Sequence, residues 1–175
     1  FGLDFSTRGR NVSVIFGDGA GAVVLQPTEN PDQGILSTHL HSDGANAEIL
    51  AMYNPGTHAN HWVTDPVASF DDAEIGQMFM SHAMVDGAQN FPNMDGPSVF
   101  KKAIVKMPEV IEEALAANSL TSADINMLIP HQANLRIAQF VQQKLQLRDD
   151  QVHNNIQKYG NTTAASVPIA LCEAW

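Results

Sequence analysis

The stretch INMLIPHQANLRIAQFVQQKL, residues 125–145, changes from one hydrophobic pattern to another on either side of a histidine. Residues 125–130 are a short apolar run bounded by turn-forming residues, which is typical of a buried strand. From about residue 133 to residue 147 the spacing of apolar residues predicts an amphipathic helix. The apolar side of this helix carries Ile137, Phe140, Val141 and Leu145. The stretch therefore predicts a strand followed by a helix, with His131 at the junction.

The rest of the chain continues this alternation. β-Branched and aromatic residues predict strands at 11–16, 21–27 and 34–44, and a strand ending in a turn at 152–160. Helical spacing predicts one helix from Gly96 to Leu115 and another that starts within residues 161–175. Strands that alternate with helices predict a layered α/β unit with at least some parallel pairing. In such units ligands bind beyond the carboxyl ends of the strands.

The first two predicted strands are joined by the glycine-rich sequence GDGAG, residues 17–21. Glycines at this spacing invite comparison with a dinucleotide-binding fingerprint, but that fingerprint requires a helix after the turn. The run Val23-Val24-Leu25, followed by Pro27, favours a strand instead. We therefore expect the glycines to serve a tight turn, with nucleotide binding as the alternative.

Residues 53–93 interrupt the regular order. They mix Pro, Gly, Asn and Asp with scattered aromatic residues and methionines, and they show no sustained period. We interpret them as an insertion that forms a surface excursion, with one short helix at about 72–85. Long connections of this kind are usually functional lids or mobile segments.

Composition limits the classes of protein to which the chain could belong. It has 175 residues, 44% of them hydrophobic, and a net charge of −10 from nine basic and nineteen acidic residues. This acidic balance makes nucleic acid an unexpected partner. The sequence has no apolar run of membrane-spanning length and no signal-peptide pattern, so we expect no membrane association and a cytoplasmic location. Both ends, at Phe1 and Trp175, are expected to be truncations of a longer chain.

His131 and Asn161 each follow a predicted strand and precede a predicted helix. His131 could be a hydrogen-bonded structural histidine, or it could be functional. The positive end of the following helix should disfavour the imidazolium, which leaves a neutral ring able to donate one hydrogen bond. Asn161 adds an amide that donates without titrating. Two neutral donors aimed at one oxygen are what an enolate or a tetrahedral anion requires.

Metal binding is the competing use of the histidines. His39 and His41 alternate on a predicted strand with Asp43, while His58 and His61 have HxxH spacing near Asp65. No HExxH helix and no Cys/His cluster supports either set, so we expect no metal. The single cysteine, Cys172, lies well inside the last predicted helix and is expected to be a packing thiol rather than a nucleophile.

Five motifs in order resemble a known family. VIFGDGAGAVVL, STHLHSDG, MDGPSVFKKA, IPHQANLRI and YGNTTAASVPIAL are similar to the C-terminal half of β-ketoacyl-acyl-carrier-protein synthase III, a condensing enzyme of the thiolase superfamily. The resemblance covers nearly the whole chain except residues 53–93. It implies a thiolase-like layered αβαβα fold, of which residues 1–175 would be mainly the C-terminal half, and a homodimer completed by the missing N-terminal half.

The resemblance also implies a site and a reaction. His131 and Asn161 match the family's catalytic histidine and asparagine, which hold the malonyl thioester oxygen during decarboxylation. The positions that would receive the acyl carrier protein and its phosphopantetheine arm are Gln132, Ala133, Asn134, Arg136, Gly96 and Phe100. Arg136 is the expected contact to an acidic carrier protein, assisted by Lys101 and Lys102. Neither a metal nor an organic cofactor is implied.

The implied function is an acyltransferase that condenses an acyl group, taken from acyl-CoA, with malonyl-acyl-carrier protein and so initiates fatty-acid synthesis. The family's nucleophilic cysteine would lie upstream of Phe1, and a glycine-rich oxyanion-hole segment would lie beyond Trp175. Two alternatives stay open. One is a related enzyme of specialised-metabolite or long-chain ketone synthesis, and the other is a non-catalytic half of a heteromeric partner.

Overall fold

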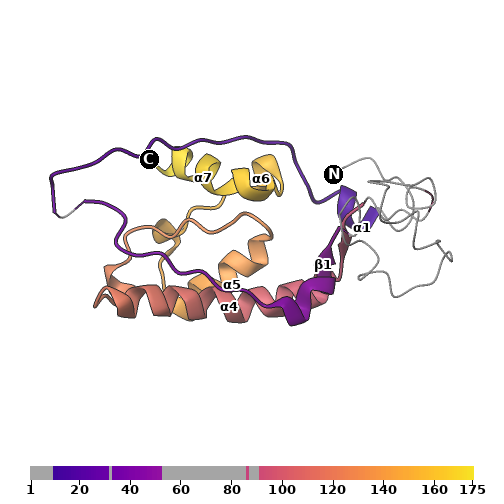
Figure 1. The fold of residues 1–175 in the computed structure, drawn as a ribbon, viewed down its shortest axis with the longest axis horizontal. Coiled ribbons are helices and arrows are strands. Elements are labelled where there is room, and N and C mark those ends of the chain that lie inside the picture. The colour runs from indigo at the N-terminus through magenta and orange to yellow at the C-terminus, as the bar shows by residue number, and fades with distance from the viewer. Residues whose placement is uncertain (1–9, 32, 53–85, 87–90) are drawn as a thin grey trace, which may run out of the picture. The chain divides into compact units, whose positions relative to one another are not determined.

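The computed structural model of the chain describes residues 10–31, 33–52, 86 and 91–175 (Figure 1). The chain divides into two compact units, one made of Phe1–Val14 and Asp43–Val99 and the other of Ile15–Ser42 and Phe100–Trp175. The short helix predicted at 72–85, and most of the insertion predicted at 53–93, lie outside the described residues.

The described part of the chain is mainly helical. Its α-helices are α1 (Arg10–Ser13), α4 (Gly96–Ala117), α5 (Leu135–Leu145), α6 (Ile156–Tyr159) and α7 (Ser166–Ala174). Its 3₁₀ helices are η1 (Gly44–Ile49), η3 (Ser122–Asp124), η4 (Asp149–Gln151) and η5 (Thr163–Ala165). Its strands are β1 (Leu50–Ala51) and β2 (Asn93–Met94), which pair antiparallel. None of the described helices combines the length and the apolar character needed to cross a membrane.

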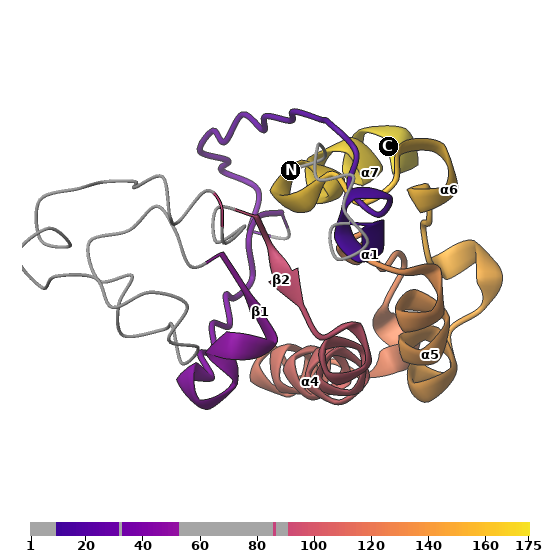
Figure 2. The same ribbon diagram turned by 90° about the vertical axis from the view of Figure 1, so that its right-hand side faces the viewer.

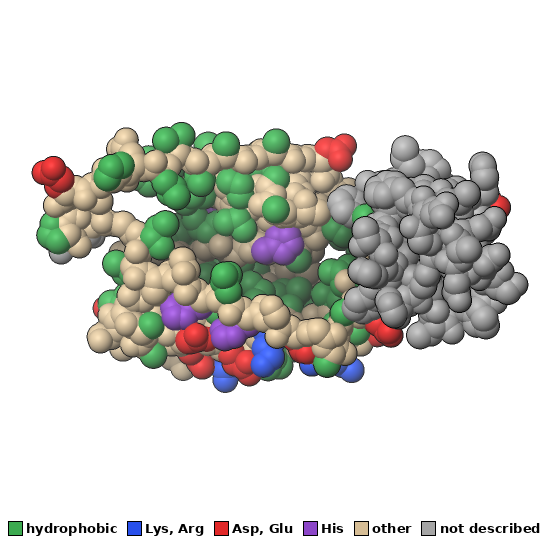
Figure 3. All heavy atoms as spheres, in the orientation of Figure 1, with side chains coloured by type: hydrophobic (Ala, Val, Ile, Leu, Met, Phe, Trp, Pro, Cys, Tyr) green, Lys and Arg blue, Asp and Glu red, His purple; other side chains and the backbone are tan. Residues whose placement is uncertain are grey.

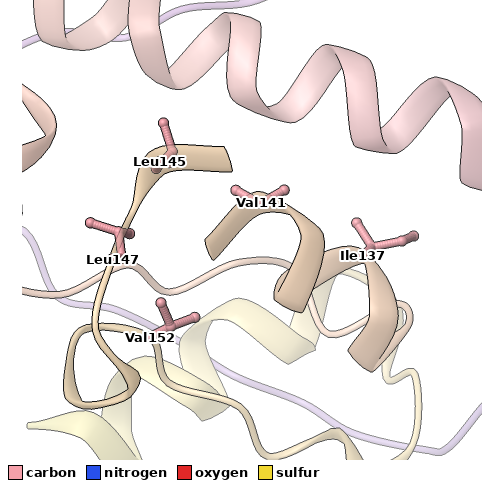
Figure 4. Packing of buried hydrophobic residues seen from close by; sticks show 5 residues of the cluster. All are labelled: Ile137, Val141, Leu145, Leu147 and Val152. Atoms are coloured by element: carbon pink, nitrogen blue, oxygen red, sulfur yellow. The ribbon is translucent and has the colours of Figure 1, made fainter. Parts of the chain in front are cut away.

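The core of the second unit lies between α4 and α5, which run side by side (Figure 2). Ile137, Val141 and Leu145 recur every four residues and so project from one face of α5 toward α4 (Figure 4). Leu147 and Val152 complete the buried cluster, against which α4 packs Phe100, Ala103, Ile104, Met107 and Ile111. Full burial of each such aliphatic side chain contributes roughly 1.5–3 kcal/mol. The helices predicted at 96–115 and 133–147 are confirmed.

Local hydrogen bonds fix both ends of α5. The Asn134 side chain accepts a hydrogen bond from the Arg136 backbone N–H at 2.9 Å and so caps the first turn. At the other end Gln146 adopts a left-handed conformation with φ of 57°, and its N–H donates back to the last turn. The helix is therefore shorter at both ends than the apolar pattern predicts, and it begins four residues after His131.

One carboxylate connects α7 to the chain around α6. Glu173 accepts hydrogen bonds from Asn155 Nδ2 at 2.8 Å, Tyr159 Oη at 2.7 Å and Lys158 Nζ at 3.1 Å. These three bonds lower the pKa of Glu173 from 4.5 to about 2, with the bond from Tyr159 as the largest cause. The helix predicted to start within residues 161–175 is confirmed and is held in place by this contact.

Most of the predicted strands are wrong. Residues 125–130 contribute a single parallel bridge, Leu128 to Val152, and residues 152–160 contain that bridge followed by α6. Residues 11–16 contain most of α1 and one parallel bridge, Phe16 to Asn161. Residues 21–27 and 34–44 contain no strand. A strand needs a neighbour to satisfy its N–H and C=O groups, and these predicted segments form at most single-residue bridges in place of ladders.

The extended segment 15–42 therefore leaves apolar side chains uncovered along its length (Figure 3). The most exposed of them are Val23, Val24, Leu25, Ile35, Leu36 and Leu40. Both bridges described above are parallel, as expected for α/β alternation. The sequence pattern thus identified segments of extended backbone but overestimated how far they are paired.

In the first unit the chain approaches α4 through a two-residue ladder. Leu50 pairs with Met94 and Ala51 pairs with Asn93. The Asp95 carboxylate then accepts hydrogen bonds from the Ser98 N–H at 3.2 Å and the Ser98 hydroxyl at 2.6 Å. A carboxylate at a helix start satisfies a free N–H and complements the helix dipole, which explains why α4 begins here.

Candidate active site

His131 lies between the bridge residue Leu128 and the helix cap Asn134. Its ring reaches solvent, and its Nδ1 atom lies 2.6 Å from the hydroxyl oxygen of Ser166 at the start of α7. Burial of part of the ring lowers the pKa of His131 below 6.5. The imidazole is therefore neutral at pH 7, which leaves Nε2 as the ring nitrogen not engaged by Ser166.

The sequence predicted this neutral state, but for a different reason. The expected cause was the positive end of the next helix, and α5 begins only at Leu135. Because the effect of a helix dipole fades within about one turn, it acts weakly on His131. Desolvation is the cause of the lowered pKa.

Asn161 is buried and held by both its backbone and its side chain. Its backbone exchanges two hydrogen bonds with the bridge segment, Gly17 N–H to Asn161 O at 3.0 Å and Asn161 N–H to Ile15 O at 3.1 Å. Its side-chain Oδ1 accepts the Thr163 N–H at 2.9 Å. That bond decides which way the amide faces, so the NH₂ group points away from Thr163 and remains available as a donor.

Thr163 adopts a left-handed conformation, with φ of 52°. This is uncommon for a β-branched residue and costs on the order of 1–3 kcal/mol. The conformation places the Thr163 N–H on the Asn161 side chain. Strain of this kind clusters at functional sites, where it holds a side chain in a working orientation.

The glycines of 17–21 have a different role from the one expected. None has a positive φ; among the described glycines only Gly34 and Gly160 do. A β-carbon at Gly17 would collide with the Tyr159 carbonyl, one at Gly19 with Thr162, and one at Gly21 with Pro168. The glycines therefore permit close packing against the segment that carries Asn161, and the tight-turn prediction is wrong.

Gln132 was predicted to receive the carrier protein, but its side chain lies in the interior. It is 3% exposed, and its amide is used entirely within the chain. Its Nε2 donates to Pro130 O at 2.9 Å and His153 O at 3.3 Å, while Oε1 accepts the N–H groups of Asn155 and Ile156 at 3.0 and 3.2 Å. This burial gives the Gln132 side chain a structural role and leaves it no free polar atom for a carrier protein. The side chain fixes the loop that follows His131 to the start of α6.

The other predicted carrier-binding residues are mostly at the surface. Arg136 is exposed on the first turn of α5, and its side chain forms no ion pair within the described part of the chain. Asn134 is exposed as the helix cap, and Ala133 is half-buried. Lys101 and Lys102 are exposed on α4, where charged side chains gather (Figure 3).

Two predicted tunnel residues lie on α4. Phe100 is half-buried and packs against the core cluster. Gly96 is half-buried at the first position of the helix, with no atom within 4 Å of where a β-carbon would lie. The core contact of Phe100 gives that residue a structural role at this position.

The histidines considered as metal ligands have other partners. His39 Nδ1 and His41 Nε2 lie 2.9 and 2.7 Å from the two carboxylate oxygens of Glu113. No group of three metal-binding side chains occurs among the residues that the structure describes. His58, His61 and Asp65 lie outside those residues. Cys172 is exposed toward the C-terminal end of α7.

Sequence reasoning missed Ser166 and Thr163 as site residues. Nothing in a single sequence showed that the Ser166 hydroxyl meets His131. The contact becomes visible only once 131 and 166 are placed in space. It links the His131 loop to the segment that carries Asn161.

Comparison with known proteins finds similarity to one enzyme family. Residues 2–44 match the family described as 3-oxoacyl-[acyl-carrier-protein (ACP)] synthase III, and residues 115–175 match 3-oxoacyl-[acyl-carrier-protein (ACP)] synthase III C terminal. The β-ketoacyl-[acyl-carrier-protein] synthase III of Rhodospirillum centenum is 42% identical over 175 residues, which cover 98% of this chain and 45% of that protein. The chain thus spans less than half the length of this relative.

Comparison with solved structures finds similarity to the same family. The 3-oxoacyl-(acyl carrier protein) synthase III of Pseudomonas aeruginosa matches with a TM-score of 0.71 and 33% identity, covering 94% of this chain and 42% of that one. A priming β-ketosynthase of a polyketide biosynthetic pathway matches with a TM-score of 0.51 and 29% identity, covering 75% and 33%. The chain therefore has the thiolase-like α/β fold that the sequence predicted, and it belongs to the β-ketoacyl-[acyl-carrier-protein] synthase III family.

Proposed function

We propose that this chain supplies the decarboxylating part of a condensing active site, with His131 and Asn161 as its catalytic residues. The full reaction joins an acyl group from acyl-CoA to malonyl-acyl-carrier protein and gives a 3-oxoacyl product that starts a fatty-acid chain. The supporting observation is that two neutral donors of different chemistry, an imidazole with a lowered pKa and an oriented amide, occur at the positions expected for this family.

The chemistry needs both donors in one step. An acyl group is first transferred from acyl-CoA to a cysteine thiolate, which releases CoA as a thiolate that takes a proton from water. Malonyl-carrier protein then loses CO₂, and the electron pair of the broken C–C bond moves into the thioester to form an enolate. His131 Nε2–H and the Asn161 NH₂ donate to the enolate oxygen while its charge develops. The enolate carbon attacks the acyl-cysteine carbonyl, a C–C bond forms, and the cysteine leaves as thiolate.

We place the nucleophilic cysteine outside residues 1–175. Cys172 lies near the C-terminal end of α7, whereas reactive cysteines are typically found near helix N-termini. In this proposal the missing segment also supplies the remaining walls of the site and the homodimer contact. In this proposal neither a metal nor an organic cofactor takes part in the reaction. We also propose that the protein acts in the cytoplasm.

Arg136 is proposed as the contact for the acidic carrier protein. The chain carries a net charge of −10, so binding of an acidic partner requires local positive charge. Arg136 is exposed and forms no ion pair with the described residues, and the two lysines at 101 and 102 add positive charge to the surface of α4. Ala133 and Asn134 would border the same contact.

The test uses the full-length protein, with the two half-reactions measured separately. We expect His131→Ala and Asn161→Ala each to reduce malonyl-carrier decarboxylation by about 10²–10³-fold, because each removes one donor from the oxyanion. Transfer of acyl groups from acyl-CoA to the enzyme should be largely preserved. Gln139→Ala, an exposed change on α5, is the matched control. Unchanged decarboxylation in His131→Ala would refute the assignment.

A second candidate is the priming of a polyketide chain by the same chemistry. The structural match to a polyketide priming β-ketosynthase favours it. The two functions differ in the acyl-CoA that is accepted, so kcat/KM measured across a series of acyl-CoA chain lengths and branching patterns separates them.

A further inference from the structure

The Ser166 hydroxyl lies where it can control the protonation of His131. It is the first residue of α7 and is 2% exposed. Its Oγ lies 2.6 Å from His131 Nδ1 and 3.2 Å from the backbone nitrogen of Gln132. Both partners come from the loop that carries His131, which lies 35 residues before Ser166 in the sequence.

Counting protons at this hydroxyl decides the direction of its bond to the histidine. A serine hydroxyl has one proton to donate and two lone pairs that accept. The Gln132 N–H is a donor, so it occupies one lone pair. Among the described residues, His131 Nδ1 is the one acceptor recorded for the hydroxyl proton. The hydroxyl therefore donates to Nδ1.

The reverse arrangement leaves a buried group unsatisfied. If Nδ1–H donated to Ser166, the oxygen would receive two N–H groups and its own proton would have no acceptor in the described surroundings. A buried donor without a partner is unfavourable. Because Nδ1 of a neutral ring must then lack a proton, the ring proton is on Nε2.

We propose that Ser166 is a positioning residue that holds neutral His131 in the tautomer with its proton on Nε2, the nitrogen that faces the substrate oxygen. In that tautomer the ring donates a hydrogen bond, and in the other it would accept one and repel an enolate. The inference rests on the proposed function for the role of Nε2. The bond from Ser166 also favours the neutral form, in the same direction as the burial that lowers the pKa of His131.

The first measurement is the tautomer itself. ¹⁵N-histidine NMR of the full-length protein at a pH where His131 is neutral distinguishes a ring nitrogen that carries a proton from one that does not, and His131→Ala assigns the signal. We expect a protonated Nε2 and an unprotonated Nδ1. A protonated Nδ1 in the unmodified protein would overturn the proposal whatever any variant does.

The second measurement compares three variants. Ser166→Ala removes the donor, Ser166→Thr keeps a hydroxyl, and Ser122→Ala is the control because its hydroxyl has no hydrogen-bond partner among the described residues. For Ser166→Ala we expect kcat for malonyl decarboxylation to fall about tenfold, with KM for malonyl-carrier protein changed less than about twofold. The pKa of His131, read from the pH dependence of its NMR signal, should rise, because a bond to the neutral form is lost. Ser166→Thr should restore most of both properties.

The outcomes separate this inference from the proposed function. A fall in rate without any change in the pKa or tautomer of His131 would mean that Ser166 serves packing alone, and would overturn the inference. If Ser166→Ala does not fold, the tautomer of the unmodified protein decides. If His131→Ala leaves decarboxylation unchanged, the proposed function fails, while the tautomer measurement still tests the hydrogen bond from Ser166.

Discussion

Replacement of Gln132 by alanine should destabilise the loop after His131 without affecting carrier binding directly. The Gln132 side chain makes four hydrogen bonds in a site where it is 3% exposed. The change leaves the N–H groups of Asn155 and Ile156 without their acceptor, and each such buried donor costs about 1–3 kcal/mol. Ile156 is only half-buried, and carbonyls that lose a donor cost less than N–H groups. We therefore expect a loss of about 3 kcal/mol in the free energy of unfolding.

Hydrogen exchange of the full-length protein locates this effect. Amides of residues 153–160 should lose protection in Gln132→Ala, because opening of a local segment is measured by its own free energy. Gln139→Ala is the matched control, since that glutamine is exposed and makes no side-chain hydrogen bond with the described residues. Decarboxylation should show a lower kcat with KM for malonyl-carrier protein little changed. A raised KM together with full protection of 153–160 would refute the positioning role and restore the contact originally predicted for Gln132.

Three further outcomes follow from the same geometry. Asn134→Ala should cost about 1 kcal/mol in thermal or urea unfolding through loss of the α5 cap, while Asn134→Asp should not, because it keeps the accepting oxygen. Glu173 has a folded-state pKa of about 2 against 4.5, so its stabilisation is complete above pH 4.5 and disappears as the pH falls toward 2. Exchange protection of α6 and α7 should therefore fall across that pH window, and Glu173→Gln should flatten the pH dependence. Arg136→Glu should raise KM for malonyl-carrier protein several-fold and leave acylation by acyl-CoA intact; equal loss in both half-reactions would mean that Arg136 holds structure.

The sequence was informative where the pattern is local. The i, i+4 stripe of Ile137, Val141 and Leu145 located α5 because a helix satisfies its own backbone and needs one buried face. The prediction that His131 follows extended backbone was likewise correct, since it lies three residues after the bridge at Leu128. Asn161 instead follows α6 and is itself a bridge residue, so the strand predicted before it was wrong. These features depend on residues that are close along the chain.

The predictions were wrong where strand pairing or a side-chain contact depends on residues that are far apart along the chain. The β-branched run at 21–27 has the composition of a strand, but a strand exists only when another segment lies beside it, and composition does not show that. The interior position of Gln132 and the contact from Ser166 were missed for a related reason. Each of these polar residues lies in a motif that the family resemblance linked to function. Only their contacts in space show that Gln132 supports the loop after His131 and that Ser166 meets the His131 ring.

The glycines at 17, 19 and 21 have a consequence for engineering. Gly19 and Gly21 are exposed, and exposed positions outside helices usually accept substitution with little effect. Here a single added methyl group would push against the segment that carries Asn161, the carboxamide proposed to be catalytic. A saturation library built on solvent accessibility alone would misclassify these sites as permissive. Their intolerance would appear as lost turnover, at positions that touch no substrate.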